Sequence, residues 1–233
     1  EPRKIKVVGT NVFKEGYFEV QPDNIEAVAF ATAALTTKGN IMIKGIKKLQ
    51  LTSFVNFLTK IGARYEYDRD QLCVWYGGEK FETAKIESSP APGFLADWLP
   101  FATLILNQAQ GKSYVHNTIY VDRLGFVQDL NRMGADIELK KPSETGFQAM
   151  ISDESYDYQN YGEPSTVAEI NGPSKLRGTR LSMEDPRFDT ALIIAALSAE
   201  GKSELLGVDE MFIRHERFFE KLSELGAELK RSE

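Results

Sequence analysis

Three segments of this sequence follow one order of features, and that internal repeat limits the possible folds more than any other feature. Each segment starts in an apolar stretch of helical period that stops at a glycine. A short strand-like stretch follows, and then an amphipathic stretch leads to a Gly-Ala pair and another short strand. The glycine and the pair are 23 residues apart in the first two segments and 25 apart in the third. The segments are residues 31–67, 101–139 and 191–230, with glycines Gly39, Gly111 and Gly201 and pairs Gly62-Ala63, Gly134-Ala135 and Gly226-Ala227.

This recurrence indicates one supersecondary unit used three times. Glycine just past a helix is the expected C-terminal cap. Apolar residues at helical spacing on each second helix predict one core-facing stripe, which strands should cover, so the class is α/β (α+β). The expected strands are residues 40–44, 112–117, 202–207, 64–67, 136–139 and 228–230. The expected core-facing residues are Phe54, Phe57, Leu58, Ile61, Phe126, Leu130, Met133, Phe218, Leu222 and Leu225.

We expect one domain over residues 1–233, made of three repeats at about 20–83, 84–152 and 166–231. Less regular stretches lie between them. Residues 87–93 are rich in Ser and Pro and predict a loop. Residues 141–165 contain several Gly, Pro and Tyr residues and predict an insertion, with a possible strand at 146–151.

The composition excludes several classes of protein. Hydrophobic residues make up 42% and charged residues 27%, which is typical of a globular protein rather than a disordered one. No apolar run approaches the roughly 20 residues of a membrane helix, and no signal peptide is visible. The net charge of −6 disfavours a nucleic-acid groove, since phosphate backbones attract basic surfaces. Glu1 in place of Met suggests that the sequence starts inside a longer chain.

The cysteine and histidine content predicts neither disulfides nor a metal site. Cys73 is the only cysteine, which suits a reducing cytoplasm, and it is expected to be a buried residue of a strand at 72–76. His116 and His215 have no partner at metal-ligand spacing. Phosphate-binding loops and dinucleotide fingerprints are absent, so no cofactor is expected.

A carboxylate lies near the start of the first helix in each repeat: Asp23, Asp97 and Asp185. Each could cap its helix by accepting N–H bonds from the first turn. A helix start also attracts anions, so the same three places are candidate ligand sites.

Arginines lie near the start of the second helix in two repeats, 12 residues after the glycine at Arg123 and 13 after it at Arg214. Leu51 occupies the matching place in the first repeat. Arg123 and Arg214 could be surface charges, or they could project into a shared cleft and bind carboxylate or phosphate oxygens. Arg187 has the same kind of rim position, and His215 beside Arg214 could touch the same anion.

The repeat and these residues together resemble the C-terminal half of the UDP-N-acetylglucosamine 1-carboxyvinyltransferase family of enolpyruvyl transferases. The resemblance runs from about Gly9 to Arg231. Its most specific stretches are Pro92-Gly93-Phe94-Leu95-Ala96-Asp97, Val121-Asp122-Arg123, Asn131-Arg132-Met133-Gly134-Ala135-Asp136 and Arg214-His215-Glu216, which leads to Lys221-Leu222-Ser223-Glu224-Leu225-Gly226-Ala227.

The resemblance implies an inside-out α/β barrel domain, with helices inside and sheets outside. It implies transfer of enolpyruvate from phosphoenolpyruvate to the 3-hydroxyl of UDP-N-acetylglucosamine, in peptidoglycan synthesis for cell wall biogenesis, in the cytoplasm. By resemblance, Asp97 contacts the sugar hydroxyl as a candidate base and Arg214 holds the phosphoenolpyruvate carboxylate. Arg123, Asp185 and Arg187 would line the cleft.

The sequence departs from the family pattern in two motifs. Leu95-Ala96 replaces the usual Pro-Thr before the aspartate, and Arg214-His215-Glu216 is one residue shorter than Arg-Gly-Tyr-Glu. The family's N-terminal domain, with its loop cysteine, a lysine and another arginine, is also missing, and Cys73 has the wrong context to replace that cysteine. We therefore expect little or no activity from this chain alone.

Two other functions remain open at this stage. One is a 3-phosphoshikimate 1-carboxyvinyltransferase-like domain, although its Lys-Glu-Ser-Asp-Arg motif is not found. The other is a non-catalytic repeat domain that binds a ligand or a partner protein.

Overall fold

The computed structural model describes residues 5–78, 80–150, 152–153, 155–208 and 216–231 as a mixed α/β structure. Its first unit contains α1 (Asn24–Thr36), β1 (Asn40–Lys44), α2 (Lys48–Lys60), β2 (Arg64–Asp68) and β3 (Gln71–Trp75). The strands form an antiparallel sheet in the order β1-β3-β2, in which Ile43 pairs with Leu72 and Tyr67 pairs with the same residue from the other side. The strands predicted at 40–44 and 64–67 are confirmed.

The second unit follows the same order and carries an insertion. It contains β4 (Lys85–Glu87), the 3₁₀ turn η1 (Ala96–Trp98), α3 (Leu99–Leu106), β5 (Gly111–His116), α4 (Phe126–Arg132), β6 (Ile137–Lys140) and β7 (Val167–Gly172). Its sheet has the order β4-β5-β7-β6, with β4 and β5 parallel and the other pairs antiparallel. The insertion between β6 and β7 carries two short helices, α5 (Pro142–Thr145) and α6 (Tyr158–Tyr161).

The third unit has a smaller sheet than the other two. It contains β8 (Arg180–Ser182), α7 (Asp189–Ser198), β9 (Glu204–Leu206) and α9 (Phe218–Glu224), and β8 pairs with β9 in parallel. The predicted strand at 202–207 is shorter than expected. The strand predicted at 228–230 is wrong, because these residues are irregular in the structure.

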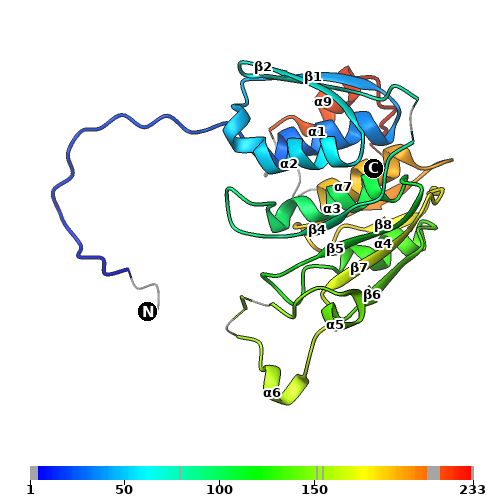
Figure 1. Cartoon of the computed structure of the whole chain (residues 1–233). Helices are drawn as coiled ribbons and strands as arrows, with labels where there is room; N and C mark the ends of the chain where they lie inside the picture. Colours follow the sequence, from blue (N-terminus) through cyan, green and yellow to red (C-terminus); the bar gives the residue numbers. More distant parts are fainter. Residues whose placement is uncertain (1–4, 79, 151, 154, 209–215, 232–233) are drawn as a thin grey trace.

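Helices α1, α3 and α7 pack against one another at the centre, and we call them the inner helices (Figure 1). Small side chains let them approach closely: in α1, the side chains of Ala27, Ala29 and Ala31 are buried. The inner helices carry apolar residues on every side because each is surrounded by protein. We call α2, α4 and α9 the outer helices. The predicted core faces of α2 and α4 are buried, and so are Phe218 and Leu222 of α9.

The three outer helices all end in the same conformation, which is formed by the Gly-Ala pairs. Each glycine is left-handed, with φ values of 72° at Gly62, 102° at Gly134 and 99° at Gly226. This conformation is free of strain only for glycine. It turns the chain so that the following alanine donates its N–H to a carbonyl five residues earlier, at distances of 2.9 to 3.0 Å. The repeated dipeptide is therefore a helix stop.

Several local predictions differ from the structure. At the end of α1, Lys38 takes the left-handed conformation (φ 60°), while Gly39 does not. The possible strand at 146–151 is not formed over its described residues, 146–150. Cys73 lies on β3 as predicted, but it is only half-buried, because it points to the outer face of the sheet, opposite Leu72 and Val74. Leu225 was expected to face the core and is 59% exposed.

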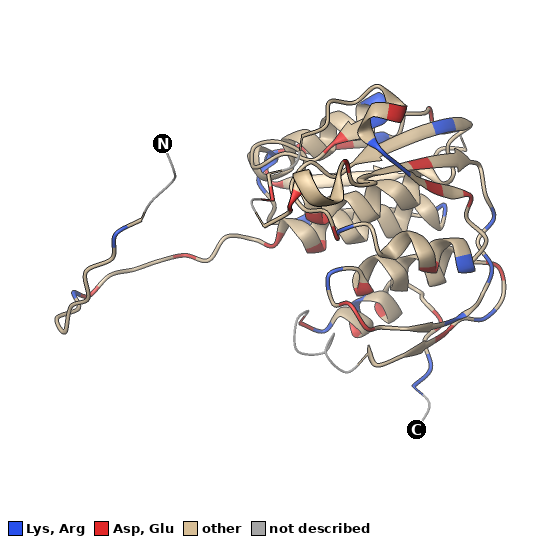
Figure 2. Cartoon of the chain, turned by 90° about the horizontal axis from the view of Figure 1, so that it is seen from below, with Lys and Arg blue, Asp and Glu red and all other residues tan. Residues whose placement is uncertain are grey.

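The N-terminal segment, residues 5–23, runs away from the folded body as an extended chain (Figure 1). Basic and acidic residues alternate along the ribbon drawn in Figure 2. In the part of the chain that the structure describes, no helix is both long and apolar enough to cross a membrane.

Candidate functional site

Asp97 lies on the turn η1, directly before the inner helix α3. The turn is anchored by Trp98, which is 1% exposed and packs edge-on against Phe54 and Phe94, with ring centroids 6.1 and 5.5 Å away. The side chain of Asp97 is 53% exposed and caps neither η1 nor α3, since neither helix has a side-chain cap. Its carboxylate is therefore available to other groups.

Arg123 approaches Asp97 from the turn before α4. Its Nη1 lies 3.4 Å from Oδ1 of Asp97, and its guanidinium carbon lies 4.4 Å from the centre of the Tyr120 ring. The Arg123 side chain is 22% exposed, and its Nε is buried without a hydrogen-bond partner among the described residues. The guanidinium is thus oriented by a ring and a carboxylate, with donors still available.

Arg187 and Asp185 form a tight pair just before α7. Nε of Arg187 lies 2.8 Å from Oδ1 of Asp185, and Nη1 lies 2.9 Å from Oδ2 of Asp122. The hydrogen bonds from Arg187, together with the charge of Arg123, lower the pKa of Asp185. Asp185 accepts the backbone N–H of Arg187 and does not cap α7, whose N-terminal cap residue is Phe188.

The structure thus brings together four of the five residues selected from the sequence: Asp97, Arg123, Asp185 and Arg187. Arg214, and His215 beside it, lie outside the described residues. Asp122 and Tyr120 join the group, and sequence reasoning had given neither of them a role. We call Asp97, Asp122, Arg123, Asp185 and Arg187 the Asp97 cluster. Three carboxylates and two guanidiniums give the cluster a formal charge of −1.

Asp23, the third carboxylate at a helix start, has a structural role. Its Oδ1 accepts the backbone N–H groups of Ile25 at 2.8 Å and Glu26 at 3.3 Å, as predicted for a cap.

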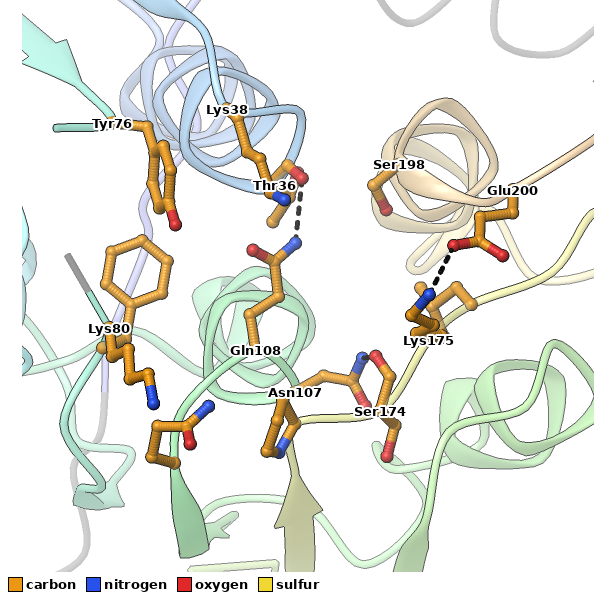
Figure 3. Close-up of a pocket in the computed structure, with 14 residues that line it drawn as sticks. Thr36, Lys38, Tyr76, Lys80, Asn107, Gln108, Ser174, Lys175, Ser198 and Glu200 are labelled. Carbon is orange, nitrogen blue, oxygen red and sulfur yellow. Dashed lines mark hydrogen bonds and ion pairs between the residues drawn. The ribbon is translucent and has the colours of Figure 1, made fainter. Parts of the chain in front are cut away.

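A polar pocket of about 330 Å³ lies where the three inner helices end (Figure 3). The Asp97 cluster lies at the opposite end of the bundle, where α3 and α7 start. The side chains of the pocket largely bond to the protein itself. Gln108 donates to the carbonyl of Thr36 at 2.8 Å, and Lys175 lies 3.0 Å from Glu200. Helix C-termini carry partial negative charge, which disfavours phosphate or carboxylate ligands. The helix starts at the Asp97 cluster are the better place for such groups.

Histidine and acidic residues do not form a metal centre in the described part of the chain: no three His, Cys, Asp or Glu residues gather there to hold an ion. His116 is fully buried, with Nδ1 3.3 Å from Glu87 and its ring 5.0 Å from that of Phe147. Burial lowers the pKa of His116, and the bond to Glu87 opposes that shift only in part. This histidine is a packed core residue.

Comparison with known proteins identifies a family. A family model described as EPSP synthase (3-phosphoshikimate 1-carboxyvinyltransferase) matches residues 1–222. The UDP-N-acetylglucosamine 1-carboxyvinyltransferase of Protochlamydia amoebophila is 31% identical over 97% of this chain and 47% of its own length. The protein of the same name from Pelagibacter ubique is 30% identical over 98% of this chain and 49% of its own length. The chain therefore spans about half the length of the curated relatives it matches.

Two solved structures show the same fold. The enolpyruvyl transferase NikO from Streptomyces tendae superimposes with a TM-score of 0.74 at 22% identity, over 91% of this chain and 44% of that one. EPSP synthase from Acinetobacter baumannii gives a TM-score of 0.62 at 17% identity, over 92% of this chain and 48% of its own. At these identities the likeness concerns the fold alone.

Proposed function

The chain belongs to the EPSP synthase (3-phosphoshikimate 1-carboxyvinyltransferase) family, an enzyme class that transfers enolpyruvyl groups, and we propose that it is the C-terminal half of a UDP-N-acetylglucosamine 1-carboxyvinyltransferase. The reaction forms a bond between the 3-hydroxyl oxygen of the sugar and C2 of phosphoenolpyruvate. The hydroxyl proton is removed and inorganic phosphate leaves. The curated relatives that carry this name at 30 to 31% identity favour this substrate pair over shikimate 3-phosphate. A role in peptidoglycan synthesis in the cytoplasm follows from that assignment.

We propose that the chain forms a single domain of three repeats, at about 20–83, 84–152 and 166–231. The repeats would be arranged as an inside-out α/β barrel. Three facts support it. The inner helices α1, α3 and α7 pack on one another, each unit places strands outside its inner helix, and the outer helices end in the same glycine conformation.

The contact between Asp97 and Arg123 is the main support for a substrate site at the Asp97 cluster. Asp97 is exposed enough to meet a sugar hydroxyl and is held in place by the buried Trp98, which suits a candidate base. Arg123 keeps donors free for an anionic oxygen, while the donors of Arg187 are engaged by Asp185 and Asp122. Of the two guanidiniums in the cluster, Arg123 is therefore the one with more donors left for a ligand, and Asp185 and Arg187 shape the rim. Arg214 is kept in the proposal as the group that holds the phosphoenolpyruvate carboxylate.

The charge of the Asp97 cluster argues that the site is incomplete. A formal charge of −1 repels a diphosphate and a phosphoenolpyruvate that are themselves anionic. Further cations must come from Arg214 and from the N-terminal domain that the longer relatives possess. Because both substrates need those cations, the chain alone should have little or no transferase activity.

A calorimetric titration tests the proposal. UDP-N-acetylglucosamine and shikimate 3-phosphate are each added at low salt to the wild-type chain and to its Asp97→Asn and Arg123→Ala variants. Weak binding of UDP-N-acetylglucosamine that both substitutions abolish supports the proposal. Preference for shikimate 3-phosphate would move the assignment to the sister enzyme. Absence of binding to either compound would favour a non-catalytic domain.

Phosphate release with both substrates present is measured in parallel. A rate of phosphate release no higher than background supports the hypothesis that the site of the isolated chain is incomplete. Sustained phosphate release by the purified chain would refute that hypothesis.

A further inference from the structure

Two connections of the second unit are longer than the matching connections of the first unit. Residues 117–125 join β5 to α4, whereas residues 45–47 join β1 to α2. The insertion, residues 141–166, joins β6 to β7, whereas residues 69–70 join β2 to β3. We call residues 117–125 the Arg123 loop, because they carry that member of the Asp97 cluster.

The Arg123 loop and the insertion meet at one end of the second sheet. His116, the last residue of β5, and Lys140, the last residue of β6, both pair with Val167, the first residue of β7. The two long connections therefore leave the sheet side by side. Figure 1 shows the insertion, with α5 and α6, projecting beyond the rest of the second unit.

The first residues of the Arg123 loop are fixed by the folded body. The backbone N–H of Thr118 donates to Oγ of Ser88 at 3.0 Å. Oδ1 of Asn117 accepts the N–H groups of Ile119 and Tyr120 at 3.0 and 3.2 Å. Asn117 and Thr118 are both buried. These bonds hold the backbone of the loop as far as Tyr120.

The insertion bonds to the same loop from the other side. The N–H of Ser152 donates to the carbonyl of Thr118 at 2.9 Å. The carboxylate of Asp153 accepts the hydroxyl of Ser155 and also its backbone N–H, the latter at 3.0 Å. These bonds from Ser155 lower the pKa of Asp153, and the backbone N–H of Val121 lowers it further. Asp153 thus faces the backbone of the Arg123 loop.

The insertion is itself fixed to the sheet before it reaches the loop. The ring of Phe147 covers β5, with centroids 5.0 Å from the ring of His116 and 6.3 Å from that of Tyr114. Glu163, near the end of the insertion, accepts the N–H of Ser143, near its start, at 2.8 Å. A segment that is closed on itself and packed on a sheet is rigid enough to hold a neighbouring loop in place.

The position of Arg123 depends on the path of its loop. The contact from its Nη1 to Asp97 is long, at 3.4 Å, and its Nε has no hydrogen-bond partner among the described residues. Its guanidinium lies over the ring of Tyr120, which belongs to the same loop. A guanidinium binds an oxygen well only when its donors are held in the right geometry. A shift of the loop backbone would therefore change the affinity of the site.

We propose that the insertion holds the Arg123 loop in place and that Asp153 is a positioning residue for Arg123. The carboxylate of Asp153 holds the backbone at Val121, and the loop then keeps the guanidinium over Tyr120 and beside Asp97. The inference rests on the proposed function for its ligand, UDP-N-acetylglucosamine, whereas the position of Arg123 can be measured without a ligand.

Two substitutions at Asp153 separate positioning from charge. Asp153→Asn removes the negative charge and keeps an oxygen that accepts N–H bonds, whereas Asp153→Ala removes both. If Asp153 acted only through its charge, both variants would bind the anionic UDP-N-acetylglucosamine more tightly at low salt. Positioning predicts a roughly 5-fold loss of affinity in Asp153→Ala and no loss in Asp153→Asn. Equal affinities in the two variants would overturn the proposal.

Asp157→Ala is the matched control. It removes a carboxylate from the same insertion, but Asp157 accepts the N–H groups of Gln159 and Asn160 at the start of α6. The affinity of this variant should not fall below that of the wild type. A loss as large as that of Asp153→Ala would show that Asp153 has no special role.

Nitrogen-15 spectroscopy measures the position of Arg123 in the ligand-free chain. Its Nε–H peak, identified by its loss in Arg123→Ala, should be displaced by the Tyr120 ring, whose centre lies 4.4 Å from the guanidinium carbon. The peak should move toward that of a free arginine in Asp153→Ala and stay in place in Asp153→Asn and Asp157→Ala. An unmoved peak in Asp153→Ala would overturn the proposal. If the wild type binds no UDP-N-acetylglucosamine, the proposed function fails, and this peak still decides the role of Asp153.

Discussion

The carboxylate of Asp97 lies 3.4 Å from the guanidinium of Arg123, a residue 26 positions further along the chain and on another turn. Both side chains are partly exposed, so the pair should contribute only about 0–1 kcal/mol to stability. Asp97→Asn should therefore melt within a few degrees of the wild type while losing affinity for UDP-N-acetylglucosamine. Thermal unfolding followed by circular dichroism checks the first part. A large drop in melting temperature would mean that Asp97 is structural.

Asp122 should reduce the affinity of the Asp97 cluster for anions, because it adds a negative charge and engages Arg187. Asp122→Asn removes one negative charge and releases Nη1 of Arg187, which lies 2.9 Å from Asp122 in the structure. The variant should bind inorganic phosphate and phosphoenolpyruvate more tightly than the wild type at low salt, by roughly 5-fold for about 1 kcal/mol of relieved repulsion. Asp68→Asn, which makes the same charge change at an exposed position on β2, should leave the affinity unchanged. Equal gains in both variants would indicate an effect of net charge alone.

His116 should make the fold less stable as the pH falls. Burial lowers the pKa of His116 in the folded chain, so below the ordinary value of 6.5 the unfolded chain binds a proton that the folded chain resists. The free energy of unfolding should keep this contribution above pH 6.5, and it should decrease as the pH falls from 7 to 5. Urea unfolding across this range should show a steeper decline for the wild type than for His116→Gln. The C2 proton of His116 should titrate below 6.5, and titration above 6.5 would contradict the assignment.

Gly134 should be the least replaceable of the glycines that close the outer helices. An alanine there would need a φ of 102°, and its Cβ would lie 3.2 Å from the carbonyl oxygen of Lys175. At Gly62, with φ 72°, the added Cβ meets nothing within 4 Å. Gly62→Ala should cost about 1–2 kcal/mol from the left-handed backbone, and Gly134→Ala should cost more because the neighbour must also shift. Urea unfolding of both variants measures the difference, and equal costs would mean that the contact at Lys175 relaxes freely.

The repeat made much of the fold predictable because local chemistry determines helix ends and strand starts. The Gly-Ala pairs marked the ends of α2, α4 and α9 correctly, since a left-handed residue is needed at each. The predicted strand at 228–230 failed for a reason outside local sequence. In the other two units, the strand after the Gly-Ala pair is held by a following strand, β3 or β7, and no described residues follow α9 as such a strand.

The site was predictable only in part. Asp97, Arg123, Asp185 and Arg187 could be selected because each lies near a helix start, and the folding of three units brings those starts together. Asp122 was not assigned a role, since its importance comes from its 2.9 Å contact with Arg187, 65 residues later in the chain. The net charge of the cluster could not be known before that contact was seen.

Ligands should meet this domain at the starts of the inner helices. Nitrogen-15 chemical-shift mapping with UDP-N-acetylglucosamine tests this expectation directly. The largest shifts should fall on the backbone amides of Asp97, Arg123 and Arg187, and they should vanish in Asp97→Asn. Shifts concentrated instead on Thr36, Gln108 and their neighbours, in the pocket at the opposite end of the bundle, would contradict it.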